Sequence, residues 1–242
     1  LYAKTFAATG VSIGLVFSAF SVSRCLLGPL IGRLSDRIGR KRILMIGLAS
    51  YTLASVLYAF AMSLWQLGMF RFVQGAAAAM VTPIAQAYIG DITPRGREGR
   101  TMNLFYSSMF LGMALGPLLG GGLSALWSYE LAFYAMGILS TIALILVAAT
   151  LPADHGRAEH GKSRPREIVP LRHVMKNDAV KAIAVYMATR GFWRQGFNTF
   201  YPLFAVASSG LGEASIGTVV SVYMLGGGLL QIPFGYLADR YP

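Results

Sequence analysis

Long apolar stretches without any charged side chain dominate the sequence. Segments free of Asp, Glu, Lys and Arg run over 5–23, 43–70, 72–90, 101–129, 131–153, 195–212 and 214–238. They lack the alternation of apolar and polar positions of a membrane β-strand, and a helix needs about 20 mostly apolar residues to cross a bilayer. The pattern predicts an all-α, polytopic membrane helix bundle, with transmembrane helices at roughly 11–31, 43–63, 67–89, 101–124, 131–151, 180–206 and 214–237.

Composition excludes the other broad classes of protein. Hydrophobic residues make up 55% of the chain and charged residues 13%, and the mean hydropathy is +0.56. Too few charges remain to cover a surface in water, and so high an apolar content excludes intrinsic disorder. A disulfide scaffold is excluded as well, because Cys25 is the single cysteine.

The positions of the basic residues predict the orientation of the chain. Sixteen of the 21 Lys and Arg residues follow the first, third and fifth predicted helices or lie at the C-terminal end, whereas the opposite side carries only Lys4. Cytoplasmic loops accumulate Lys and Arg, so we expect these segments to be cytoplasmic and residue 1 to lie outside. The net charge of +11 then reflects membrane orientation, and we expect no nucleic-acid partner.

The polar stretch from Pro152 to Asp178 separates five predicted helices from two. We therefore expect an N-terminal helical bundle over 1–151, a cytoplasmic linker over 152–179 and the start of a C-terminal bundle over 180–242. The protein is expected to be a monomer in the inner (plasma) membrane of a bacterium, in contact with the lipid bilayer, without a cofactor or a metal site.

An internal repeat relates the two predicted bundles. Shifting the sequence by 203 residues superposes 11–37 on 214–240 with 11 identities in 27 positions and no gap. The identities end in Gly-x-Leu-x-Asp-Arg, from Gly32 to Arg37 and again from Gly235 to Arg240. Shared apolar composition explains matched leucines but not this charged pattern in register. Two related halves are a common plan of membrane transporters, and the second half stops after its second helix, so we expect a truncated chain.

The segment between the first two predicted helices reads Gly32-Arg-Leu-Ser-Asp36-Arg37-Ile-Gly39-Arg40-Lys41-Arg42. Gly32 permits close approach of helices, and Gly39 permits a tight turn between antiparallel spans. The Asp36 carboxylate can accept hydrogen bonds from arginines or from a helix N-terminus. A basic loop required only by topology is the simpler interpretation, but the copy with Gly235, Asp239 and Arg240 argues against it.

This segment resembles the signature between the second and third helices of the major facilitator superfamily. The resemblance covers essentially the whole chain and implies a secondary transporter of which helices two to eight are present and the first helix is missing. It also implies that the segment forms a cytoplasmic gate between two halves, with Asp36 central to its charge network.

The third predicted helix contains Arg71-Phe-Val-Gln74-Gly75, which resembles the fourth-helix motif of that family. The resemblance implicates the arginine in proton transfer or substrate coupling. An arginine inside a membrane is costly and usually faces a cavity or a partner; the alternative is that Arg71 extends outward to the interface. Arg24 leaves a similar choice open, between reaching toward the cytoplasm and pairing with an acid outside this chain.

The fourth predicted helix carries Gly112, Gly116, Pro117, Gly120 and Gly121. Glycines four residues apart allow helix backbones to touch, and Pro117 removes a backbone hydrogen bond. Generic packing is one interpretation. The pattern also resembles the antiporter motif of the drug:proton branch of the family.

The sixth predicted helix places Arg190, Arg194 and Asn198 close to one face with two tyrosines, and the resemblance implies that this helix lines the central cavity. No Asp or Glu lies within any predicted span, although proton coupling needs a titratable group. Either that carboxylate lies on a helix outside this chain, or the cavity is basic and favours an anion.

These motifs predict a proton-coupled exporter of small organic molecules or drugs that works by alternating access. The alternatives are a carrier of an anionic metabolite, in either direction, and a transporter-like receptor or scaffold. We do not expect an enzyme, because the sequence contains no His-Glu-x-x-His, no Gly-x-Ser-x-Gly and no phosphate-binding loop.

Overall fold

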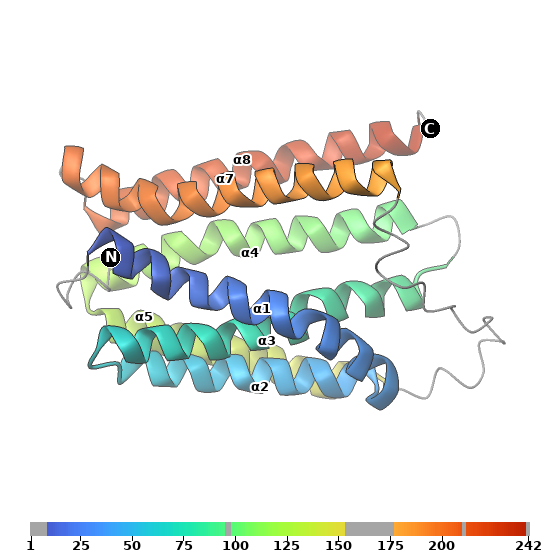
Figure 1. Cartoon of the computed structure of the whole chain (residues 1–242), viewed down its shortest axis with the longest axis horizontal. Helices are drawn as coiled ribbons and strands as arrows, with labels where there is room; N and C mark the ends of the chain where they lie inside the picture. Colours follow the sequence, from blue (N-terminus) through green and yellow to red (C-terminus); the bar gives the residue numbers. More distant parts are fainter. Residues whose placement is uncertain (1–8, 95–97, 153–176, 210–211, 241–242) are drawn as a thin grey trace. The chain divides into compact units, whose positions relative to one another are not determined.

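The computed structural model describes residues 9–94, 98–152, 177–209 and 212–240. Within these ranges the chain is all-helical, as predicted, and contains no strand. Figure 1 shows the helices, which are α1 (Gly10–Ile38), α2 (Arg40–Ala59), α3 (Leu64–Ile92), α4 (Glu98–Leu126), α5 (Tyr129–Thr150), α7 (Asp178–Ser209) and α8 (Glu213–Arg240).

Five helices are long and apolar enough to cross a membrane, namely α1, α2, α3, α5 and, over Gly99–Leu126, α4. Five of the predicted spans are therefore confirmed by length and composition. Helix α7 carries Lys181, Arg190 and Arg194, and in α8 the apolar stretch found is Ala214–Gly227. Membrane spanning by these two helices stays a prediction.

The first helix is longer than the sequence predicted. Helix α1 continues to Ile38 instead of ending near residue 31, so Gly32, Asp36 and Arg37 are helical and do not form a loop. A single residue, Gly39, separates α1 from α2; its φ of 102° is a conformation that glycine adopts without strain. The tight turn predicted at Gly39 is confirmed, and it removes any need for a longer connection.

The longer helices also change where the acidic residues lie. The predicted spans contained no Asp or Glu, but the observed helices include acids near their ends, namely Asp36 of α1, Asp91 of α3, Glu98 of α4, Glu130 of α5, Asp178 of α7, and Glu213 and Asp239 of α8. Each of these residues sits in a first or last turn, because polar helix ends extend beyond the apolar stretch that the hydropathy pattern detects.

Serines fix where two helices begin at the end of the bundle opposite the turn at Gly39. The Ser63 hydroxyl accepts a hydrogen bond from Gln66 N at 3.3 Å, and Gln66 Oε1 accepts one from Met62 N at 2.7 Å. At α5 the Ser128 hydroxyl accepts from Leu131 N at 3.3 Å. These bonds satisfy amide groups that have no partner within the helix.

The helices group into two compact units, one with α1 to α5 and α8, and the other with α7. In the first unit α1 packs on α3, α2 packs on α3 and α5, and α4 packs on α8. The regions expected from the sequence, 1–151, 152–179 and 180–242, remain a prediction.

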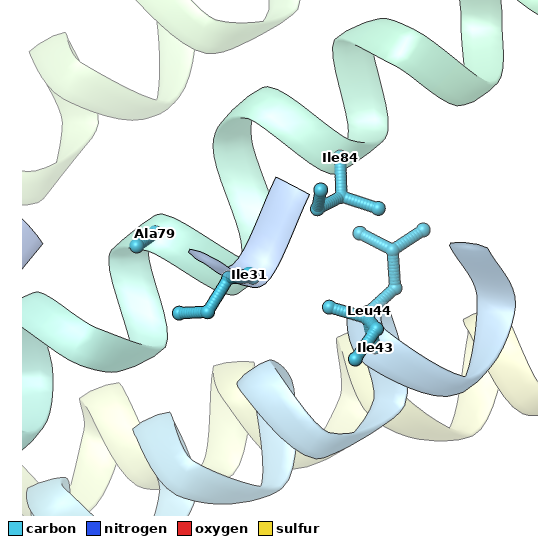
Figure 2. Close-up of a cluster of buried hydrophobic side chains, with 5 residues drawn as sticks. All are labelled: Ile31, Ile43, Leu44, Ala79 and Ile84. Carbon is cyan, nitrogen blue, oxygen red and sulfur yellow. The ribbon is translucent and has the colours of Figure 1, made fainter. Parts of the chain in front are cut away.

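A cluster of apolar side chains joins three helices near the turn at Gly39. Figure 2 shows its members, which are Ile31 of α1, Ile43 and Leu44 of α2, and Ala79 and Ile84 of α3. A Cβ at Gly47 of α2 would lie 2.7 Å from Met80 Cβ, so the absence of a side chain lets α2 approach α3. This packing positions the basic residues that follow Gly39.

Candidate functional site

A polar cluster lies between α1, α2 and α3, and we call its members Phe17, Tyr58, Arg71 and Gln74 the Arg71 cluster. Arg71 Nη1 donates a hydrogen bond to Gln74 Oε1 at 3.1 Å, one helical turn away on α3. The Tyr58 hydroxyl of α2 donates to the same oxygen, also at 3.1 Å. Tyr58 is 3% exposed and Gln74 8% exposed, so both bonds lie inside the bundle.

Aromatic rings hold the Arg71 guanidinium in this position. Its Cζ lies 4.7 Å from the centroid of the Phe17 ring and 5.7 Å from that of Tyr58. The Tyr58 ring stacks on Phe133 of α5 at 5.2 Å and meets Phe70 of α3 edge-on at 5.9 Å. A guanidinium over an aromatic face is attracted by the ring quadrupole. Arg71 therefore turns into the bundle and does not extend to the interface, which was the alternative interpretation.

The charge of Arg71 has no carboxylate within 4.0 Å among the described residues. Arg24 of α1 is exposed and forms no ion pair within the same part of the chain. Arg71 is therefore a cation inside the first unit without a described carboxylate beside it, and the Tyr58 ring lies 5.7 Å from it.

A second cluster of charges lies where α1 meets α2, and we call Asp36, Arg40 and Asp91 the basic-end network. Arg40 Nε lies 2.6 Å from Asp91 Oδ2, and Arg40 Nη2 lies 3.8 Å from Asp36 Oδ1. The Arg40 side chain is 14% exposed, whereas the two acids are about half exposed. The network ties the ends of α1 and α3 to the start of α2. Arg37 lies in the last turn of α1 and directly follows Asp36 in the sequence.

Lys41 connects the same end of α2 to α5. Its Nζ donates hydrogen bonds to the carbonyl oxygens of Ala148 at 2.8 Å and Leu151 at 2.5 Å. Carbonyl groups in the last turn of a helix have no partner within the helix and carry its negative dipole end, which favours a cation. Lys41 thus caps the C-terminal end of α5.

The antiporter-like glycines of α4 do not all form contacts. A Cβ added at Gly112, Gly116 or Gly120 would meet no other part of the described chain within 4 Å. Pro117 and Gly121 do meet α8, because a Cβ at Gly217 would lie 2.5 Å from Pro117 O and 3.5 Å from Gly121 Cα. The predicted close approach at Gly32 is also not seen, since a Cβ there has no neighbour within 4 Å in the described residues.

The remaining predicted residues lie on the other helices. Arg190, Arg194 and Asn198 lie on the continuous helix α7, in the second unit. Gly235, Asp239 and Arg240 belong to the last turns of α8, and their side chains lie outside the part of the chain that the structure describes. The gate and cavity roles of all these residues stay predictions.

Sequence reasoning missed Tyr58, Asp91 and the partner of Pro117. Nothing distinguishes Tyr58 from other tyrosines in apolar runs. Asp91 could have been noticed as a lone acid that directly follows a span and precedes a basic segment. Gly217 is identical to Gly14 in the internal repeat, which indicated a repeated helix but no contact with α4.

Known proteins resemble the chain over its whole length. It is 28% identical over 242 residues to an uncharacterized MFS-type transporter of Methanocaldococcus jannaschii, a match of 99% of this chain and 62% of that protein. It is 26% identical over 242 residues to the quinolone resistance protein NorA of Staphylococcus aureus strain Mu50, a match of 100% of this chain and 61% of that protein. The chain therefore spans about three fifths of the length of these relatives.

The polytopic helices and the charged turn at Gly39 agree with a match to the family model of the Major Facilitator Superfamily over residues 1–242. The chain belongs to the Major Facilitator Superfamily of membrane transporters.

Proposed function

We propose that this protein is a secondary active transporter that exports small organic molecules in exchange for protons, by alternating access. The observation that carries the proposal is Arg71, a cation held inside an apolar bundle by Gln74 and two aromatic rings. A charge at such a position is costly and typically marks the path of a substrate or an ion. The similarity to a protein named for quinolone resistance supports a drug-like substrate.

The basic-end network supplies the gate in this mechanism. With the basic residues on the cytoplasmic side, Arg40 and its two acids hold the inner ends of α1, α2 and α3 together while the substrate site faces outward. Breaking these ion pairs lets the inner end open. Exposed ion pairs have small net energies, which suits contacts that must form and break in every cycle.

Transport by inside-out membrane vesicles tests this function. The vesicles are made from cells that express the complete reading frame, and the measurement is the uptake of a fluorescent fluoroquinolone with and without an imposed pH gradient. Arg71→Ala is expected to abolish the uptake that depends on the gradient, whereas Arg33→Ala, on the exposed surface of α1, is expected to retain it. Unchanged gradient dependence in Arg71→Ala rejects the coupling role, and binding of the drug without uptake by the unaltered protein indicates a receptor.

The second candidate is transport of an anionic metabolite. The specific observation in its favour is that Arg24 and Arg71 lie well inside α1 and α3, whereas the described carboxylates lie at helix ends. An anion-selective carrier is expected not to take up the fluoroquinolone, with or without a pH gradient, and to exchange organic acids instead.

A further inference from the structure

We propose that Gly75 is a positioning residue for Arg71, because it lets the backbones of α1 and α3 touch and so holds the Phe17 ring against the guanidinium. Gly75 ends the motif that begins at Arg71, and the proposed function uses only the arginine and the glutamine of that motif. This role rests on the proposed function, and it adds to the Arg71 cluster the residue that sets the geometry of the cluster.

Gly75 is buried where the backbone of α3 meets that of α1. A Cβ added at Gly75 would lie 3.0 Å from both the Cα and the carbonyl carbon of Phe20, and closer still to the Phe20 carbonyl oxygen. These are backbone atoms, which cannot rotate away as the end of a side chain can. Only glycine therefore fits at this position while the two helices keep their separation.

The backbone contact lies one helical turn from the contact between Arg71 and Phe17. Phe20 follows Phe17 by three residues on α1, and Gly75 follows Arg71 by four residues on α3. Each step is about one turn of helix, so the pair of Phe20 and Gly75 lies directly below the pair of Phe17 and Arg71 along the two helices. The separation of the backbones at Gly75 thus sets how far the Phe17 ring lies from the guanidinium.

The residues beside this contact leave no room for adjustment. Ser23, one turn beyond Phe20 on α1, is 0% exposed, and Ala77 and Ala78 of α3 are 0% and 2% exposed. Small buried side chains have few rotamers with which to absorb a shift. A methyl group added at Gly75 therefore moves α1 away from α3, and Phe17 moves with α1.

Phe17 is the nearer of the two rings that contact Arg71, at 4.7 Å against 5.7 Å for Tyr58. The attraction between a guanidinium and a ring requires a centroid within about 6 Å. Tyr58 is held by Phe70 of α3 and Phe133 of α5, so its place does not depend on α1. The separation of α1 and α3 therefore controls the Phe17 contact and leaves the Tyr58 contact in place.

The simpler alternative is that Gly75 serves packing alone, and Gly47 of α2 provides the matched comparison. Gly47 is also buried, and a Cβ there would lie 2.7 Å from Met80 Cβ of α3. Met80 follows Arg71 by nine residues, about 14 Å along the helix. Gly47→Ala thus disturbs a tight helix contact without reaching the Arg71 cluster.

Chemical labelling of Arg71 tests the positioning without any need for transport. The purified protein, expressed from its complete reading frame, reacts with phenylglyoxal, and mass spectrometry compares the labelling of Arg71 with that of Arg33, which is exposed on α1. Gly75→Ala and Phe17→Leu are each expected to raise the relative labelling of Arg71 several-fold, because the ring no longer covers the guanidinium. Gly47→Ala is expected to leave the ratio unchanged.

The pH dependence of uptake by inside-out vesicles is the functional measurement. Gly75→Ala and Phe17→Leu are expected to flatten it, because a guanidinium without its ring no longer keeps one position. The double variant is expected to lose no more than either single variant, since both act through the same contact. Gly47→Ala is expected to keep the pH profile of the unaltered protein even where its total uptake is lower.

Two results would overturn the positioning role. The first is equal labelling of Arg71 in Gly75→Ala and the unaltered protein, and the second is the same rise in labelling in Gly47→Ala. Circular dichroism reports whether Gly75→Ala folds. Where it does not fold, Phe17→Leu decides, because unchanged labelling of Arg71 in that variant shows that the ring does not cover the guanidinium.

The positioning role and the transport function fail in different ways. Gradient-driven uptake with an unaltered pH profile and unaltered labelling in Gly75→Ala ends the positioning role and leaves the transport function standing. Labelling that responds as expected, in an unaltered protein whose uptake ignores the pH gradient, ends the proton-coupled function and leaves the positioning role.

Discussion

Arg40 Nε lies 2.6 Å from Asp91 Oδ2 and joins the first residue of α2 to the last turn of α3. The Asp36 carboxylate, which the resemblance placed at the centre of the charge network, lies farther from Arg40, at 3.8 Å. Arg40 reaches both acids because Gly39 is the only residue between α1 and α2. The closer partner of the arginine therefore comes from a helix far away in the sequence.

Asp91→Asn is expected to reduce transport several-fold with little change in the thermal unfolding midpoint. The Asp91 side chain is 59% exposed, and exposed ion pairs contribute only about 0–1 kcal/mol to stability. The variant is therefore expected to weaken the closed gate without unfolding the protein. Vesicle uptake and a melting curve in detergent measure the two quantities. Asp178→Asn, which breaks the exposed pair with Lys181 on α7, is the control. A large drop in the midpoint with unaltered transport contradicts the gating role.

Asp36→Asn is expected to weaken the same gate while membrane insertion stays intact. Its longer distance to Arg40 predicts a smaller loss of transport than that of Asp91→Asn. Near-normal uptake by Asp36→Asn in the complete protein contradicts a gating role for Asp36.

Lys41→Met is expected to destabilise the protein by about 1 kcal/mol, because two carbonyl groups at the end of α5 lose their cation. Arg42→Met removes a neighbouring charge whose side chain is exposed, so it is expected to change stability less. The measurement is the thermal unfolding midpoint of each variant in the same detergent. Equal midpoints for Lys41→Met and Arg42→Met show that Lys41 does not cap α5.

Gly217→Ala is expected to destabilise the protein by about 1–3 kcal/mol, because the added Cβ lies 2.5 Å from Pro117 O and α4 and α8 must move apart. Gly226→Ala on the same helix meets nothing within 4 Å in the described chain, and alanine is the better helix former by about 1 kcal/mol. The two melting midpoints should therefore move in opposite directions, and a stabilised Gly217→Ala contradicts the close packing.

Tyr58→Phe is expected to lower the free energy of unfolding by about 1 kcal/mol, because it removes a buried hydrogen bond to Gln74 and keeps the stacked ring. Gln74 then binds Arg71 alone, so the pH-gradient dependence of uptake is expected to change as well. Tyr134→Phe, at an exposed tyrosine of α5, is the matched control. An unchanged pH dependence in Tyr58→Phe shows that Tyr58 does not orient Arg71.

The sequence determined the class of fold, the order of the membrane helices and the turn at Gly39. These features follow from local properties, which are the length of each apolar run, the clustering of arginine and lysine, and the conformational freedom of glycine. The repeat and the motifs around Asp36 and Arg71 also indicated the family, because each consists of residues close together in the sequence and needs no knowledge of contacts between helices.

Only the tertiary structure decided which side chains meet. Asp91 and Tyr58 became partners of Arg40 and Gln74 because α3 packs beside α2, and no local pattern records how two helices are rotated against each other. In the same way, Gly112, Gly116 and Gly120 matched a motif, yet the described contacts of α4 with α8 fall on Pro117 and Gly121. In lipid the apolar faces of a helix are nearly equivalent to one another, so close packing and a few polar contacts choose the interface, and these exist only after the helices assemble.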